Sequence, residues 1–159
     1  MPQPSSKDPK RLPPLLRRAW YGLNQAFRQR VAHLGITPDQ FSILRWLLEG
    51  DPAGLTQRQI TDLMASDPNT ITSTLSRMEK AGLIARKLHE SDRRAHRVVI
   101  LKEGTEIFAS AKKLALELQI QILSALPEDR RDSFLAELEI VGNACAAALE
   151  DGASPRKAG

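Results

Sequence analysis

The side chains with the clearest chemical potential are the polar residues that alternate with an apolar stripe between Asp67 and Gly82. Ile71, Leu75 and Met78 recur at helical spacing and predict one buried helix face. Amide, hydroxyl and guanidinium groups on the other face can bind base edges or phosphates, and Asn can pair with adenine. The pattern predicts a helix that contacts nucleic acid, and the alternative is a polar face that is merely solvated. The candidate contacts are Asn69, Thr70, Thr72, Ser73, Ser76 and Arg77.

A hairpin with a charged tip is predicted immediately after this helix. Residues 83–88 and 97–101 are apolar or β-branched enough to form two strands, and the residues between them are polar. At the tip, Arg93 and Arg94 are suited to a narrow DNA groove, and Asp92 is placed to orient one of them. The alternative is a solvated turn. We favour the groove contact because clustered arginines repel one another unless an anion is near.

The positive charge of the chain is concentrated in this helix and hairpin. From Arg77 to Lys102, eight Lys and Arg side chains oppose three acidic ones, a net charge of +5, whereas the whole chain carries +4. Arg86 and Arg97 lie on the two predicted strands and are further candidate DNA contacts. Residues 103–159 carry six basic and ten acidic side chains. We therefore expect an anionic partner, double-stranded DNA, at the helix and hairpin.

A second short helix is predicted before the polar one. Thr56 and Gln59 have the spacing of a capping box, which begins a helix. Thr56, Gln57 and Arg58 could bind phosphate there through the helix terminus and their side chains. The few residues that separate the two helices fit a helix-turn-helix, and the hairpin completes a winged helix-turn-helix.

Long helices with apolar stripes are predicted on both sides of the winged unit. The fold class is therefore mainly α with a small β-wing: a winged helix-turn-helix at about residues 38–102 between N- and C-terminal dimerisation helices at about 13–35 and 103–150. Such long apolar stripes are more than a winged unit needs. We expect a single domain, with residues 1–12 and 151–159 as disordered tails.

The composition argues against several other sites and locations. No apolar run reaches a membrane span, and the polar start lacks the apolar segment of a secretory signal, so we expect a cytoplasmic protein. Cys145 is the single cysteine and lies on an apolar helix stripe, where we favour a buried structural residue, with a redox sensor as the alternative. His33, His89 and His96 have no metal-ligand spacing, so neither a metal nor a cofactor is expected.

An enzyme and a protein-interaction module are the rival classes. The sequence lacks a Gly-rich phosphate loop, a nucleophile elbow and a recognisable carboxylate pair, so we expect no enzyme. A protein-binding winged helix would be expected to expose apolar anchors, whereas the predicted outer face is rich in Asn, Ser and Thr.

The residues of the winged unit resemble a known family. Residues 63–101 read LMASDPNTITSTLSRMEKAGLIARKLHESDRRAHRVVIL and are followed by KEG, which is similar to the MarR family (multiple antibiotic resistance regulators). The similarity lies in the helix ending EKAGLIAR and in Asp92, Arg93 and Arg94 followed by Arg97 and Gly104. With the order of helices, it covers about residues 13–150.

The resemblance implies a ligand-responsive repressor that acts as a homodimer on a pseudo-palindromic operator. It also implies that Arg94 enters the minor groove with Asp92 as its supporting partner. Many relatives respond to small phenolic or amphipathic effectors. The expected partners are therefore double-stranded DNA, a second copy of the chain, and an aromatic or amphipathic effector. The candidate effector-pocket residues, for which plain core packing is the alternative, are Trp20, Tyr21, Phe27, His33, Phe41 and Trp46.

Overall fold

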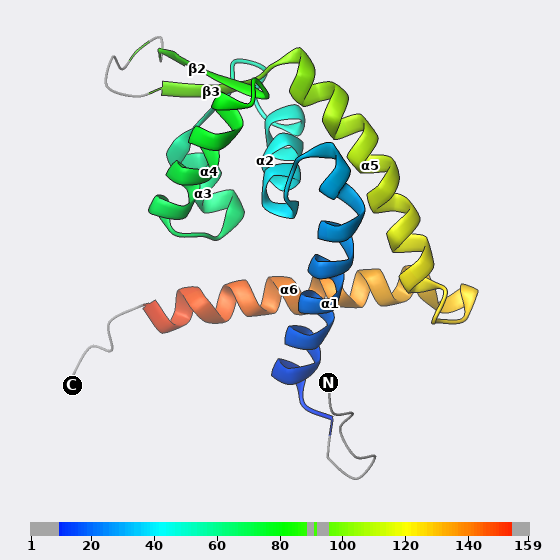
Figure 1. Cartoon of the computed structure of the whole chain (residues 1–159). Coiled ribbons are helices and arrows are strands. Elements are labelled where there is room, and N and C mark those ends of the chain that lie inside the picture. The colour runs from blue at the N-terminus through cyan, green and yellow to red at the C-terminus, as the bar shows by residue number, and fades with distance from the viewer. Residues whose placement is uncertain (1–9, 89–90, 92–95, 154–159) are drawn as a thin grey trace, which may run out of the picture. The chain divides into compact units, whose positions relative to one another are not determined.

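The computed structural model describes residues 10–88, 91 and 96–153, and the side chains among these up to residue 150. The chain divides into two compact units, Met1–Leu118 and Gln119–Gly159. Figure 1 shows the elements along the chain. The helices are α1 (Leu12–Val31), the 3-10 turn η1 (Ala32–Leu34), α2 (Pro38–Glu49), α3 (Gln57–Met64), α4 (Pro68–Lys80), α5 (Lys102–Leu123), the 3-10 turn η2 (Glu128–Arg130) and α6 (Arg131–Ala153), and the strands are β1 (Leu55–Thr56), β2 (Ile84–Leu88) and β3 (His96–Ile100).

Side-chain caps begin the three helices of the winged unit. In α2, the Thr37 hydroxyl accepts from the Gln40 backbone N–H at 3.2 Å, and the Gln40 side chain accepts from the Thr37 backbone N–H at 3.0 Å. The same capping box joins Thr56 and Gln59 at the start of α3. Asp67 caps α4. The predicted capping box of α3 is confirmed. Each of the three caps satisfies backbone donors that have no partner within the helix.

The hairpin is confirmed as part of an antiparallel sheet with strand order β1-β3-β2. Arg86 of β2 pairs with Val98 of β3, and Val98 pairs on its other side with Leu55 of β1. The two-residue strand β1 was not predicted, because so short a segment has no periodicity. Gly54 leads into it at a φ of +97°, and a Cβ there would lie 2.5 Å from the carbonyl oxygen of Val98. The chain can approach β3 this closely because residue 54 is glycine.

One apolar core holds the winged unit together. Its fully buried side chains come from the end of α1, from α2, α3, α4 and α5, and from strands β2 and β3. An aromatic row connects α1, α2 and α5: the Phe27 and Phe41 rings meet edge to face with centroids 5.0 Å apart, and the Phe41 and Phe108 rings stack at 5.0 Å. The helices that carry the DNA candidates are thus fixed to α1 and α5 by core packing. The largest fully buried side chains are Ile43, Leu44, Ile60, Ile71, Leu75, Met78, Ile84, Val31 and Val98.

The apolar stripes of the terminal helices are largely exposed. In α1, only Phe27 and Val31 are buried, whereas Trp20 and Leu23 are exposed. The expectation that Cys145 is buried was wrong for this chain, since its side chain is exposed. Cys145 does lie on an apolar stripe of α6, but the residues of that stripe remain accessible, as for Leu138. An apolar face by itself does not bury a side chain; a partner must cover it.

Candidate nucleic-acid interface

Helix α4 has one buried and one exposed face. Ile71, Leu75 and Met78 are buried in the core as predicted, and Thr74 is buried beside them. Of the six candidate contacts on this helix, Ser76 is half-buried. The remaining candidates are exposed: Asn69, Thr70, Thr72, Ser73 and Arg77. Because the core fixes the buried side, the polar side is a preformed surface.

Two exposed side chains at the start of α4 form the helix cap. The Thr70 backbone N–H donates to Asp67 Oδ1 at 2.9 Å, and the Thr70 hydroxyl donates to Asp67 Oδ2. The hydrogen bond from the Thr70 hydroxyl, followed by that from its backbone N–H, lowers the pKa of Asp67 below its ordinary value. These hydrogen bonds therefore favour the charged carboxylate, and the Thr70 hydroxyl hydrogen is engaged in the cap.

Arg77 folds back along the surface of α4. Its Nε donates to the backbone oxygen of Ser73 at 3.3 Å, and its Nη2 donates to Ser73 Oγ at 3.0 Å. A guanidinium has five N–H donors, so these two bonds fix its direction and leave others for an anion or a base. Ser73 and Arg77 thus act together on the exposed face.

The start of α3 lies against the exposed face of α4. Gln57 Nε2 donates to Thr72 Oγ1 at 2.6 Å, and the Thr72 hydroxyl donates to the backbone oxygen of Pro68 at 2.8 Å. Arg58 is exposed next to Gln57. Residues 56–58 and α4 are therefore brought together as the helix-turn-helix prediction requires, although the bond between Gln57 and Thr72 could not be inferred from their separation in the sequence.

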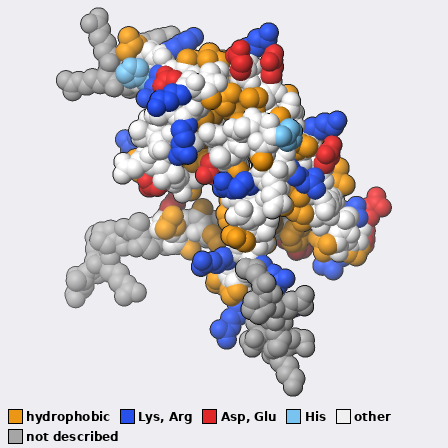
Figure 2. Space-filling view, in the orientation of Figure 1, with side chains coloured by type: hydrophobic (Ala, Val, Ile, Leu, Met, Phe, Trp, Pro, Cys, Tyr) orange, Lys and Arg blue, Asp and Glu red, His pale blue; other side chains and the backbone are white. Residues whose placement is uncertain are grey.

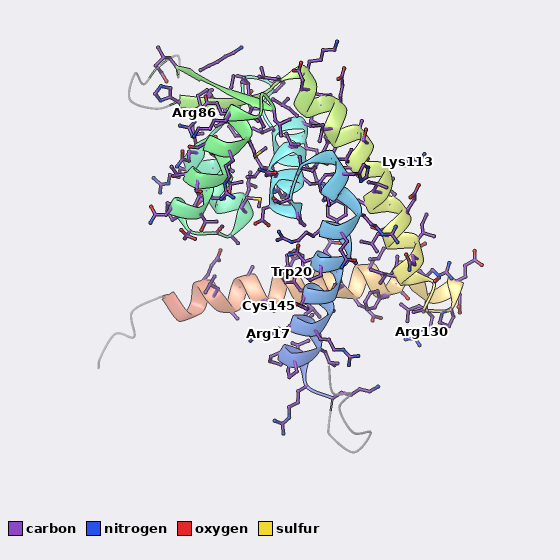
Figure 3. All side chains as sticks on the ribbon, in the orientation of Figure 1. Arg17, Trp20, Arg86, Lys113, Arg130 and Cys145 are labelled. Atoms are coloured by element: carbon purple, nitrogen blue, oxygen red, sulfur yellow. The ribbon has the colours of Figure 1, made fainter. Side chains whose placement is uncertain are left out.

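Arg86 connects the hairpin to the end of α4. Its Nε lies 3.7 Å from Glu79 Oε2, and Figure 3 labels it on β2 at the hairpin end of the unit. Its side chain is 30% exposed, yet its Nε and Nη2 atoms are buried and form no hydrogen bond within the part of the chain that the structure describes. The predicted tip contacts lie outside the described residues: Asp92, Arg93 and Arg94.

Arg97 is engaged inside the winged unit. Its Nη1 donates to the backbone oxygen of Gly54 at 2.8 Å and lies 3.5 Å from Asp51 Oδ2. Its side chain is only 23% exposed. The structure therefore gives Arg97 a contact that joins β3 to the turn between α2 and β1, a role that its place in a basic segment did not suggest.

Figure 2 shows Lys and Arg side chains on the visible face of the hairpin end.

The candidate effector residues lie in different surroundings. Phe27 and Phe41 belong to the aromatic row of the core, and Trp46 is partly buried against that core. Trp20 and Tyr21 are 64% and 56% exposed. His33 is also exposed. The six candidate side chains thus differ in burial: two lie in the core, one lies partly buried against it, and three are exposed.

The described residues contain neither a candidate metal site nor a candidate membrane span. No group of three or more His, Cys, Asp or Glu side chains that could hold a metal ion is found within residues 10–88, 91 and 96–153. Among the helices of this part of the chain, none combines the length and apolarity that a membrane span requires.

This geometry defines a winged helix-turn-helix protein. The sequence profile of the MarR family matches residues 34–95. The structure is similar to that of the transcriptional repressor CouR bound to a 23-mer DNA duplex, with 30% identity, a TM-score of 0.73, and coverage of 80% of this chain and 89% of CouR. The chain belongs to the MarR family of transcriptional regulators, so the predicted resemblance is confirmed, and members of this class are regulators and not enzymes.

Further relatives agree with this assignment. The chain is 35% identical over 86 residues to the uncharacterized HTH-type transcriptional regulator YsmB of Bacillus subtilis, covering 54% of this chain and 57% of YsmB. It is 30% identical over 100 residues to the regulator PecS of Dickeya dadantii, covering 62% and 60%. The matches thus span about three fifths of the length of these curated relatives. The fold is also similar to that of Staphylococcus aureus MepR in a complex with DNA, with a TM-score of 0.77, 21% identity, and coverage of 86% of this chain and 99% of that one.

Proposed function

We propose that this protein is a sequence-specific DNA-binding repressor that acts as a homodimer on a pseudo-palindromic operator and responds to a small molecule. The observation that carries the proposal is the two-sided helix α4. Its apolar face is completely buried in the core, as at Leu75, while its opposite face presents Asn69, Ser73 and Arg77 to solvent. A helix held in this way can enter the major groove with no rearrangement of its own.

In this proposal α4 reads bases while the neighbouring elements contact the backbone. Arg58 at the start of α3 is placed for a phosphate. Arg93 and Arg94 of the hairpin tip would reach the adjacent minor groove, with Arg94 inserted and Asp92 supporting it. Arg97 serves the fold in this proposal and does not contact DNA, because its side chain is only 23% exposed and its Nη1 is bound to Gly54 and Asp51.

The proposed homodimer is supported by the uncovered apolar side chains of the terminal helices. Trp20 and Leu23 on α1 are exposed, as are Phe134 and Leu138 on α6. Exposed apolar patches of this kind indicate an interaction surface. A two-fold dimer would present two copies of α4 to half-sites about one DNA turn apart.

The repressive sign is supported by a relative, and the effector is an expectation from the family resemblance. CouR is named a transcriptional repressor and is bound to DNA in its structure. An aromatic or amphipathic effector would weaken DNA binding by favouring a spacing of the two α4 helices that does not match the operator. Such a regulator would act in the cytoplasm, where it can reach DNA. A pocket that includes Trp20, Tyr21 or Trp46 remains part of this proposal.

The proposal is tested by selecting duplexes from a random double-stranded library with the purified full chain. We expect a two-fold symmetric motif. Asn69→Ala should weaken binding to the selected duplex, whereas Ser110→Ala, a substitution of an exposed polar side chain on α5, should leave it unchanged. Arg94→Ala should also weaken binding while leaving the dimer intact in sedimentation.

Salt dependence supplies a second measurement. Affinity should fall steeply as salt rises from about 50 to 200 mM, because phosphate contacts release counterions. A flat salt response together with no enriched sequence would contradict DNA recognition and would favour the protein-interaction module.

A further inference from the structure

The bond between Gln57 and Thr72 crosses the helix-turn-helix on its exposed side. Gln57 is the first residue of α3, and Thr72 lies in the second turn of α4, fifteen positions later. The Thr72 side chain is exposed and Gln57 is partly exposed, so the pair lies on the surface that is proposed to face DNA. These two residues join the two helices by their side chains where a base edge would approach.

The hydrogen-bond directions of this pair are determined by its neighbours. The Thr72 hydroxyl donates its single hydrogen to the backbone oxygen of Pro68 at 2.8 Å. Any group 2.6 Å from Thr72 Oγ1 must therefore be a donor, which identifies the Gln57 atom at that distance as Nε2 and not Oε1. The amide orientation of Gln57 follows from this chemistry.

We propose that Gln57 is a specificity-determining residue that reads an adenine, and that Thr72 is the positioning residue that orients it. With one Nε2 hydrogen donated to Thr72, Gln57 keeps the Oε1 acceptor and a second Nε2 hydrogen. An acceptor and a donor on one amide match adenine N6–H and N7 in the major groove. A thymine or cytosine at that position offers no such pair, and guanine offers two acceptors. Thr72 itself donates nothing to DNA. This inference rests on the proposed DNA-binding function.

The bond to Thr72 orients the Gln57 amide before DNA binds, and this lowers the cost of pairing with a base. A free glutamine must give up rotamer freedom when it forms two bonds with a base, and its amide can present either order of donor and acceptor. The bond to Thr72 excludes the flipped amide, in which Oε1 and Nε2 exchange places. Loss of Thr72 should therefore affect the same base position as loss of Gln57.

The experiment is selection from a random duplex library, with the full chain and four variants, followed by affinities for the selected duplex and its single-base changes. Gln57→Ala should flatten the preference for adenine at one position of each half-site, a change of roughly 5- to 150-fold in discrimination. Thr72→Val, which keeps the shape but lacks the hydroxyl, should flatten the same position. Thr72→Ser should restore it, because the hydroxyl is retained.

Thr105→Val is the matched control. Thr105 also donates its hydroxyl to the backbone four residues earlier on an exposed helix face, but it lies on α5. Its selected motif should equal that of the wild type, and thermal melting of all variants should show intact folding. A motif unchanged in Gln57→Ala overturns the inference, as does a Thr72→Ser variant that behaves like Thr72→Val. A uniform loss of affinity for every sequence would make Gln57 a phosphate contact and also overturns it. A wild-type protein that enriches no sequence overturns the proposed function, and the inference with it.

Discussion

Arg97 provides a direct test of whether a basic residue of the hairpin serves the fold or the DNA. Its Nη1 donates to the Gly54 backbone oxygen at 2.8 Å, and its side chain is 23% exposed. A hydrogen bond from a charged donor contributes about 1.5–3 kcal/mol to stability. The ion pair with Asp51, at 3.5 Å and with the Asp51 side chain 53% exposed, adds at most about 1 kcal/mol.

We therefore expect Arg97→Met to lower the free energy of unfolding by about 2–3 kcal/mol, a drop of roughly 5–10 °C in melting temperature for a chain of this size. Lys87→Met is the matched control. Lys87 pairs with Arg97 across the hairpin but is exposed, so its loss should change stability by less than about 0.5 kcal/mol. Asp51→Asn should fall between the two variants.

The assay is urea unfolding followed by circular dichroism at one fixed protein concentration, since association would shift the midpoint. DNA affinity is then measured at a temperature where each variant is folded. The two Met variants remove one positive charge each, so their affinities should be similar. If Arg97→Met keeps wild-type stability but binds DNA more than about tenfold more weakly than Lys87→Met, the structural role is refuted and Arg97 is a DNA contact.

Three further changes test the packing, the cap and the dimer. Gly104→Ala should cost about 1–3 kcal/mol in melting experiments, because its Cβ would lie 2.3 Å from the Leu83 carbonyl oxygen. The lowered pKa of Asp67 means that its stabilisation is present above the ordinary carboxyl pKa and is lost as pH falls through the lowered one. The stability advantage of the wild type over Asp67→Asn should thus disappear in acid urea titrations, and a constant advantage would contradict the role of the charge. Leu138→Glu should weaken the dimer roughly tenfold or more in sedimentation equilibrium, whereas Ile140→Glu, roughly 200° around α6, should not.

The architecture of the winged unit could be predicted because its signals are local. The Thr56 cap lies three residues from Gln59, and the spacing of Ile71, Leu75 and Met78 repeats within one helix. Such patterns depend on the helix period and on hydrogen bonds between near neighbours. The strands of the hairpin were predictable from another local signal, two short runs of apolar and β-branched residues separated by a polar segment.

The details of the site depended on contacts between distant residues. Arg97 bonds to Gly54, 43 positions away, and Gln57 bonds to Thr72 across the turn between two helices. The two-residue strand β1 is likewise defined by its partner β3 and not by its own pattern. The sequence placed Arg97 and Arg86 in one basic segment, but it could not distinguish a guanidinium bound within the fold from one facing solvent.

The sequence by itself determined which helix faces are apolar, where helices begin and where positive charge gathers, because these are properties of neighbouring residues. It could not determine whether an apolar face is covered. Cys145 lies on a predicted stripe of α6 and is nevertheless exposed, as is Leu138. Burial and hydrogen-bond partners are decided when separate segments pack together, and for this reason the tertiary structure alone showed that Arg97 is tied to Gly54 and that Gln57 is oriented by Thr72.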